Sequence, residues 1–143
     1  MLYALSIFYF SAQPESSAGS MTSSLLDWFP NLARSDVQAL IFYIRKLGHV
    51  LAYGVAAGLI VFALRGMPRL RKQALPLGFV LTMILAGLDE WYQSILPHRT
   101  GAFTDVLIDM IGVIIAVVIL KYVLLRRDYQ EEQQEQEAAE HDN

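Results

Sequence analysis

Hydrophobic residues in this chain come in long blocks that contain small residues, and most of the charged residues lie between the blocks. No block shows the strict alternation of a half-buried strand or the narrow apolar stripe of a surface helix. A helix needs about twenty mainly apolar residues to cross a bilayer. The pattern therefore predicts an all-α protein, a polytopic bundle of membrane helices.

Three of these blocks are long enough to form clear transmembrane helices, at about residues 47–64, 74–91 and 102–125. Residues 34–46 are expected to form the interfacial part of the first of these helices, and residues 11–24 a Ser-rich loop. At the N-terminus, residues 1–10 make only a short, partial span. We expect this to be the outer half of a first helix whose true start lies upstream.

Residues 1–127 are thus predicted to form one transmembrane domain, followed by an acidic tail at residues 128–143. Like charges repel in this tail and little apolar surface is available, so we expect it to be partly helical or disordered. Ser35 or Asp36 is a candidate N-cap for the helix of the first clear span, and Thr104 for the helix of the last. Small residues that would allow close helix contact are Gly54, Ala56, Ala57 and Gly58.

The tail also hides the charge of the rest of the chain. It holds seven of the fourteen acids, and the remainder carries eleven Lys and Arg against seven acids, a net of +4. By the positive-inside rule, the basic loop at residues 65–72 and the Arg126–Arg127 pair are expected on the cytoplasmic side, with the tail. The loop is too short and too close to the membrane to bind nucleic acid. The absence of cysteine excludes disulfides and cysteine-based zinc sites.

Polar residues within the spans converge on the opposite, outer side. They stand at helical spacing on three helices: Lys46, His49 and Tyr53; Asp89, Glu90 and Gln93; Asp105, Asp109 and Gly112, with Arg99 in the loop before the last span. A charge within a bilayer costs about 2.5 kcal/mol or more unless it is paired or hydrated. Chance would scatter such residues over both leaflets, so their convergence predicts a site.

Each residue also has a purely structural explanation. Lys46 can extend from a helix end to the lipid phosphates, and Asp89 can pair with Arg99 to hold a loop against a helix end. Tyr53 and Gly112 can be packing residues, and Asp105 a first-turn acid that suits the helix dipole. These explanations account for single residues better than for the convergence of the whole set.

The order of these motifs resembles the VanZ-like family of bacterial membrane proteins. The motifs are K-x-x-H-x-x-x-Y from Lys46, D-E-x-x-Q from Asp89, and R-x-x-x-x-x-D-x-x-x-D-x-x-G from Arg99; residues 10–20 are also similar to the segment that leaves that family's first helix. Many members have Asn where this chain has Asp109. The resemblance implies a small multi-pass protein of the bacterial cytoplasmic membrane, and the family's founding member is linked to teicoplanin resistance. It implies no established reaction.

Three functions are compatible with the predicted site. In the first, Lys46, His49 and Arg99 attract the phosphate or carboxylate of a membrane lipid or a lipid-linked cell-wall precursor. The other predicted ligand-binding residues are Tyr53, Gln93, Asp105 and Asp109. In another, the cluster is only a structural clamp within a membrane subunit, whose protein partners and oligomeric state stay open.

The remaining candidate function is catalysis, as a membrane-embedded hydrolase or transferase. Glu90 or Asp89 would act as general base and His49 as acid or metal ligand. No Ser or Cys nucleophile is paired with a base, so a hydrolase would activate water. A divalent cation held by His49, Asp89, Glu90 and Asp109 could do this, but no local motif such as H-E-x-x-H supports it. We therefore predict no resident metal or cofactor.

Overall fold

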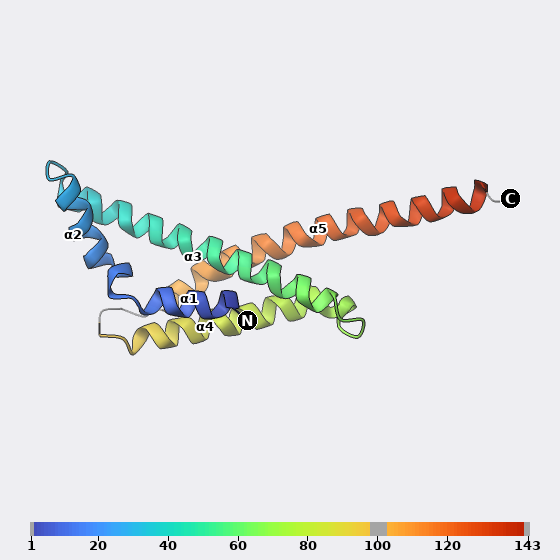
Figure 1. The fold of residues 1–143 in the computed structure, drawn as a ribbon, viewed down its shortest axis with the longest axis horizontal. Helices are drawn as coiled ribbons and strands as arrows, with labels where there is room; N and C mark the ends of the chain where they lie inside the picture. The colour runs from blue at the N-terminus through green and yellow to red at the C-terminus, as the bar shows by residue number, and fades with distance from the viewer. Residues whose placement is uncertain (1, 98–102, 142–143) are drawn as a thin grey trace.

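Three long apolar helices form the body of the molecule in the computed structural model, which describes residues 2–97 and 103–141 (Figure 1). The elements in order are α1 (Leu2–Ala12), the 3-10 turn η1 (Pro14–Ser16), α2 (Ala18–Trp28), α3 (Arg34–Arg65), the 3-10 turn η2 (Arg71–Gln73), α4 (Ala74–Ser94) and α5 (Phe103–His141). No strand occurs in the described part of the chain. Segments Arg34–Arg65, Arg71–Ser94 and Phe103–Arg127 are long and apolar enough to cross a membrane. The predicted all-α membrane bundle is confirmed.

Helices α3 and α5 run in the same direction and cross near the middle of α3 and in the first third of α5, and α4 runs antiparallel against both. Lys46 of α3 therefore lies beside Asp105 of α5, while Val61 and Leu120 lie together further along both helices. The bundle has two chemically different ends. We call them the polar end, where Lys46 and Asp105 lie, and the basic end, which holds the loop at residues 65–72.

The crossing of α3 and α5 depends on Gly112. A Cβ atom at this position would lie 2.1 Å from the carbonyl oxygen of Val50, far inside any real contact distance. Gly54 approaches from the other helix, where a Cβ would lie 3.3 Å from the carbonyl oxygen of Gly112. The predicted close approach at Gly54 is thus confirmed, and Ala57 is fully buried. Gly58 makes no such contact, because a Cβ there would meet nothing within 4 Å.

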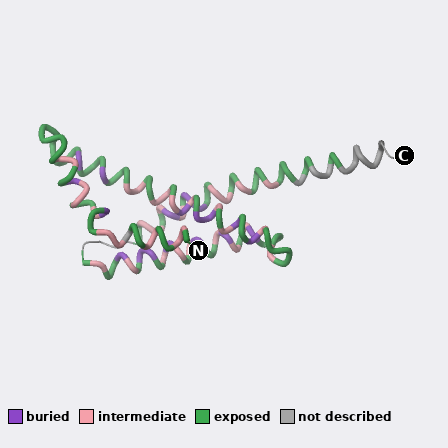
Figure 2. The backbone as a smooth tube through the Cα atoms, in the orientation of Figure 1, coloured by how far each residue is buried: buried purple, intermediate pink, exposed green. Residues whose placement is uncertain are grey.

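Buried residues are confined to the faces where the helices meet, and the outer faces are apolar and exposed (Figure 2). Tyr53, Ala57, Ala86 and Val113 form a buried cluster. By contrast, large side chains such as that of Phe62, which is 81% exposed, cover the outside. In water such a surface would aggregate, whereas in a membrane it is the surface that contacts lipid.

The Ser-rich segment was expected to be a loop, and this expectation is wrong for most of it. Ser17 caps α2, since its hydroxyl accepts a hydrogen bond from the backbone N–H of Ser20 at 3.2 Å. Within α2, the hydroxyl of Thr22 donates to the carbonyl of Ala18 at 2.7 Å. Serine is a favoured N-cap as well as a loop residue, and here the capping role begins a helix. The resulting α2 packs against α3.

Helix ends also differ from the predicted caps. Helix α3 begins at Arg34 with Ala33 as N-cap, so Ser35 and Asp36 lie in its first turn, where the acid still suits the dipole. Helix α5 begins at Phe103, which places Thr104 inside the helix. Of the two conformations expected for the tail, the structure has the helical one as far as His141.

The short first helix packs along α4 and is fixed to α3. At eleven residues, α1 is about 16 Å long, which is too short to cross a membrane alone. The hydroxyl of Tyr3 donates to the backbone carbonyl of Ala52 at 3.0 Å. This bond holds α1 and the following η1 against the middle of α3.

We expect Gly112→Ala to lower the free energy of unfolding by about 1–3 kcal/mol, because the added methyl group forces α3 and α5 apart. Unfolding in mixed detergent micelles measures this change. Gly58→Ala is the matched control and should be neutral or slightly stabilising, since its methyl group meets open space. Equal stability of the two variants would contradict the role given to Gly112.

Candidate functional site

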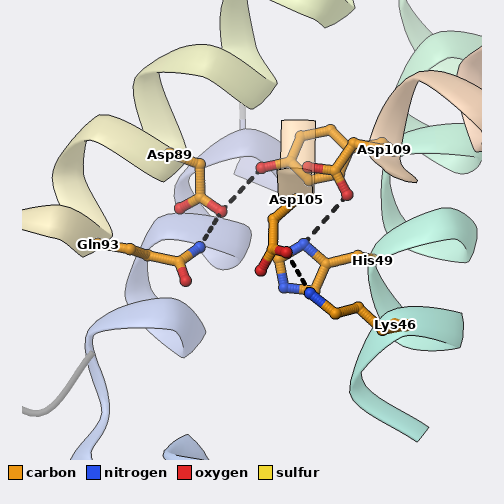
Figure 3. A network of polar contacts seen from close by, with 7 residues as sticks. Lys46, His49, Asp89, Gln93, Asp105 and Asp109 are labelled. Atoms are coloured by element: carbon orange, nitrogen blue, oxygen red, sulfur yellow. Dashed lines mark hydrogen bonds and ion pairs between the residues drawn. The ribbon is translucent and has the colours of Figure 1, made fainter. Parts of the chain in front are cut away.

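Side chains from one face of α3 reach across to α5 at the polar end (Figure 3). Lys46 forms an ion pair with Asp105, and Nδ1 of His49 lies 3.1 Å from Oδ1 of Asp109. The spacing of three residues on α3 and four on α5 lets both pairs form, since each is close to one helical turn. Two parallel helices are therefore linked by two successive polar pairs.

The next residue of this face, Tyr53, links α3 to α4. Its hydroxyl donates to Oδ2 of Asp89 at 2.8 Å, and the side-chain amide of Gln93 donates to the same oxygen at 2.7 Å. Asp89 and Gln93 lie one turn apart on α4, as their spacing predicted. Two donors on one oxygen fix the position of the buried Asp89 side chain between α3 and α4.

The cluster has a deep layer and a more accessible rim. Asp89, Asp109 and Tyr53 are each 1% exposed. At the rim, the side chains of Lys46 and Asp105 are 23% and 13% exposed. The deep layer joins the three helices, whereas the rim remains within reach of a ligand.

The structure thus brings together seven predicted site residues: Lys46, His49, Tyr53, Asp89, Gln93, Asp105 and Asp109. Glu90 is buried in the same turn of α4 as Asp89. Arg99 lies outside the described residues. Gly112 follows Asp109 by about one turn and serves the helix crossing.

A pocket of about 360 Å³ opens beside this cluster. Its walls come from α1, η1, α2 and α3, and its lining is mainly apolar: Phe10, Ser16, Met21, Ile44, Arg45, Gly48, His49, Ala52 and Tyr53. His49 and Tyr53 belong to both the polar cluster and the pocket. Arg45 brings a positive charge to the pocket wall.

Sequence reasoning missed Arg45 and Ser16 as pocket residues. Arg45 adjoins Lys46, but one residue along a helix turns the side chain to a different face. That face meets the pocket wall that η1 and α2 supply, in the segment expected to be a loop. The hydroxyl of Ser16 is held by the carbonyls of Phe10 and Gln13 at 2.8 and 2.7 Å, so it shapes the pocket wall.

Acids outnumber bases among the described residues of the cluster. The acids are Asp89, Glu90, Asp105 and Asp109, and the bases are Lys46 and His49, each of which is paired with an acid of α5. The acids therefore hold the bases in position. An anionic ligand in the pocket would meet both Arg45 and His49, which share one of its walls.

The hydrogen bond between His49 and Asp109 determines which nitrogen of the imidazole can act on a ligand. Because Nδ1 faces Asp109, Nε2 is the nitrogen that can accept a proton from another group or donate one to it. A carboxylate at Nδ1 also fixes the orientation of the ring. As for metals, no three His, Asp or Glu side chains in the described segments are grouped to hold an ion.

Comparisons with known proteins give one match. A family model described as VanZ/LLP1 matches residues 1–126, which includes the three membrane-spanning segments of the described chain except for the last residue, Arg127. Searches of curated proteins and of solved structures found no match.

Tyr53→Phe should lower the free energy of unfolding by about 1–3 kcal/mol, because it removes one donor from a buried carboxylate while keeping the ring. Unfolding in mixed micelles measures the change. Tyr43→Phe removes the same hydroxyl from a side chain that is 69% exposed and should have little effect. A Tyr53→Phe variant as stable as the control would show that the Tyr53–Asp89 bond adds nothing to stability.

Asp109→Asn should be tolerated better than Asp109→Leu. The Asn side-chain oxygen can still accept from Nδ1 of His49, whereas Leu leaves that nitrogen buried without its acceptor. We expect the Leu variant to be less stable than the Asn variant by about 1–3 kcal/mol. Equal stability of the two variants, both below the wild type, would mean that the charge of Asp109, and not its acceptor, holds His49.

Proposed function

The chain belongs to the VanZ/LLP1 family, and we propose that it binds an anionic amphiphile, a phospholipid or a lipid-linked cell-wall intermediate, at the outer leaflet of the bacterial cytoplasmic membrane. One observation carries this proposal. A pocket with mainly apolar walls lies directly beside the polar cluster, and Arg45 and His49 both line it.

The pocket suits a molecule with a charged head and an apolar body. A phosphate or carboxylate oxygen can accept charge-assisted hydrogen bonds from Arg45 and from protonated Nε2 of His49. The apolar part of the same molecule can lie against Phe10, Met21 and Ile44. Burial of apolar surface then adds to the electrostatic attraction.

The orientation follows from the distribution of basic residues. The loop at residues 65–72 and the Arg126–Arg127 pair lie at the end opposite the cluster, which favours that end for the cytoplasm. The pocket then faces the outer leaflet, and the tail is cytoplasmic. Because the resemblance links the family's founding member to teicoplanin resistance, we infer an effect on teicoplanin-type susceptibility.

Lipid binding can be measured by native mass spectrometry of the purified protein. We expect phosphatidylglycerol to bind more tightly than phosphatidylcholine with the same acyl chains. Arg45→Gln should weaken one phosphatidylglycerol site about tenfold, which corresponds to about 1.4 kcal/mol. Arg34→Gln is the control, because it removes the same charge from the first turn of α3, away from the pocket lining.

Two results would contradict the proposal. Equal affinity for the two lipids would show that the anionic headgroup is not recognised. Equal losses in Arg45→Gln and Arg34→Gln would show that diffuse positive charge, and not the pocket, attracts the lipid. In cells, expression of the wild-type protein should change teicoplanin susceptibility and Arg45→Gln should not. Both proteins must reach the membrane in equal amounts.

The His49–Asp109 pair favours a second candidate, hydrolysis or group transfer on a lipid-linked phosphorylated substrate. A histidine oriented by a carboxylate is a common general acid or base. A polyprenyl diphosphate is a suitable probe, with phosphate release as the readout. Catalysis predicts that His49→Gln or Glu90→Gln abolishes release while the helical circular dichroism spectrum is unchanged. If the wild-type protein releases no phosphate, the catalytic function is wrong and lipid binding is the function that stands.

A further inference from the structure

A second pocket, of about 300 Å³, lies at the basic end of the bundle. It is lined by the end of α3, the start of η2 and the part of α5 that follows the crossing: Val61, Phe62, Arg65, Gly66, Arg71, Leu120, Leu124 and Arg127. The pocket shares no residue with the one beside His49. It is therefore a separate candidate site.

Three arginines from three elements meet at this pocket. Arg65 ends α3, Arg71 begins η2 and Arg127 follows the last apolar turns of α5. A general preference for basic residues on one side of the membrane explains their presence at this end, but not their convergence. Arg126 shows the difference, because its guanidinium stacks on Tyr122, 4.7 Å from the ring centre.

The apolar walls of the pocket lie toward the middle of the membrane from the arginines. Val61 and Phe62 precede Arg65 by about one turn, and Leu120 and Leu124 precede Arg127 by one or two turns. The three arginines therefore lie at the level where the spans end, and the apolar walls lie deeper in the membrane. This order matches a phospholipid, whose phosphate lies above its acyl chains.

We propose that this pocket binds the phosphate of an anionic phospholipid in the leaflet at the basic end, with an acyl chain between α3 and α5. Guanidinium groups donate several hydrogen bonds in a planar fork that fits phosphate oxygens. Basic pockets between membrane helices are suited to such headgroups. Arg65 also lies at the negative end of the α3 dipole, so Arg71 and Arg127 are the positions to test.

The test uses the full-length protein in detergent with a phosphatidylglycerol that carries a photoreactive group on its acyl chain. We expect crosslinks on the peptides that contain Phe62 and Leu124, and about tenfold weaker binding at this site in Arg71→Gln/Arg127→Gln. The matched control is Arg69→Gln/Arg126→Gln, which removes two arginines from the same end of the bundle, neither of which lines the pocket. The control should crosslink like the wild type.

Other arms separate the alternatives. Leu124→Trp keeps all three arginines but fills the pocket, so it should lose the crosslinks even if the double variant fails to fold. Arg45→Gln should retain them, because it changes only the pocket beside His49. Equal losses in the two double variants would overturn the proposal in favour of diffuse charge. Displacement of the lipid by millimolar inorganic phosphate would overturn it in favour of a free anion.

Discussion

The contact between Gly112 and Val50 determines how the rest of the bundle is arranged. Because no side chain separates the two helices there, α3 and α5 lie close enough for short polar side chains to meet across them. His49, next to Val50, lies opposite Asp109, which precedes Gly112 by about one turn, and the next turn of both helices brings Lys46 to Asp105. A larger residue at the crossing would separate both pairs, and unpaired charges at this depth are costly. The two polar pairs therefore depend on the glycine.

A structural clamp and a ligand site are compatible within one cluster. Asp89 is fully buried and held by Tyr53 and Gln93, which joins α3 to α4 and leaves it little freedom to act on a ligand. His49 is different, because it is paired through one nitrogen and also lines the pocket. The deep layer fixes the backbone positions on which the rim depends. This division explains why one set of residues supports both interpretations.

Helical spacing was enough to predict which side chains share a face, because three- and four-residue steps return to the same side of a helix. Those faces and the shared end of the spans predicted that the polar residues converge, but the pairing of Lys46 with Asp105 and of His49 with Asp109 is set by the crossing of α3 and α5. The pocket was not predictable in the same way. Its walls need α2, whose serines favour both loops and helix caps, and its charge comes from Arg45, which lies off the predicted face. Both depend on tertiary packing, which periodicity does not encode.

The crossing also explains why the basic end has a pocket at all. Two straight helices that touch at one point must separate on either side of it, and Figure 1 shows α5 leaving α3 beyond the crossing. The gap there is walled by Phe62, Leu120 and Leu124, with arginines at its mouth. At the other end α3 is covered by α1, η1 and α2, and the polar pairs hold α5 beside it. The close contact thus accounts for the pocket at the basic end, whereas the pocket beside His49 forms where α1, η1 and α2 cover α3. Each pocket combines apolar surface with arginine, as a phospholipid site in either leaflet would require.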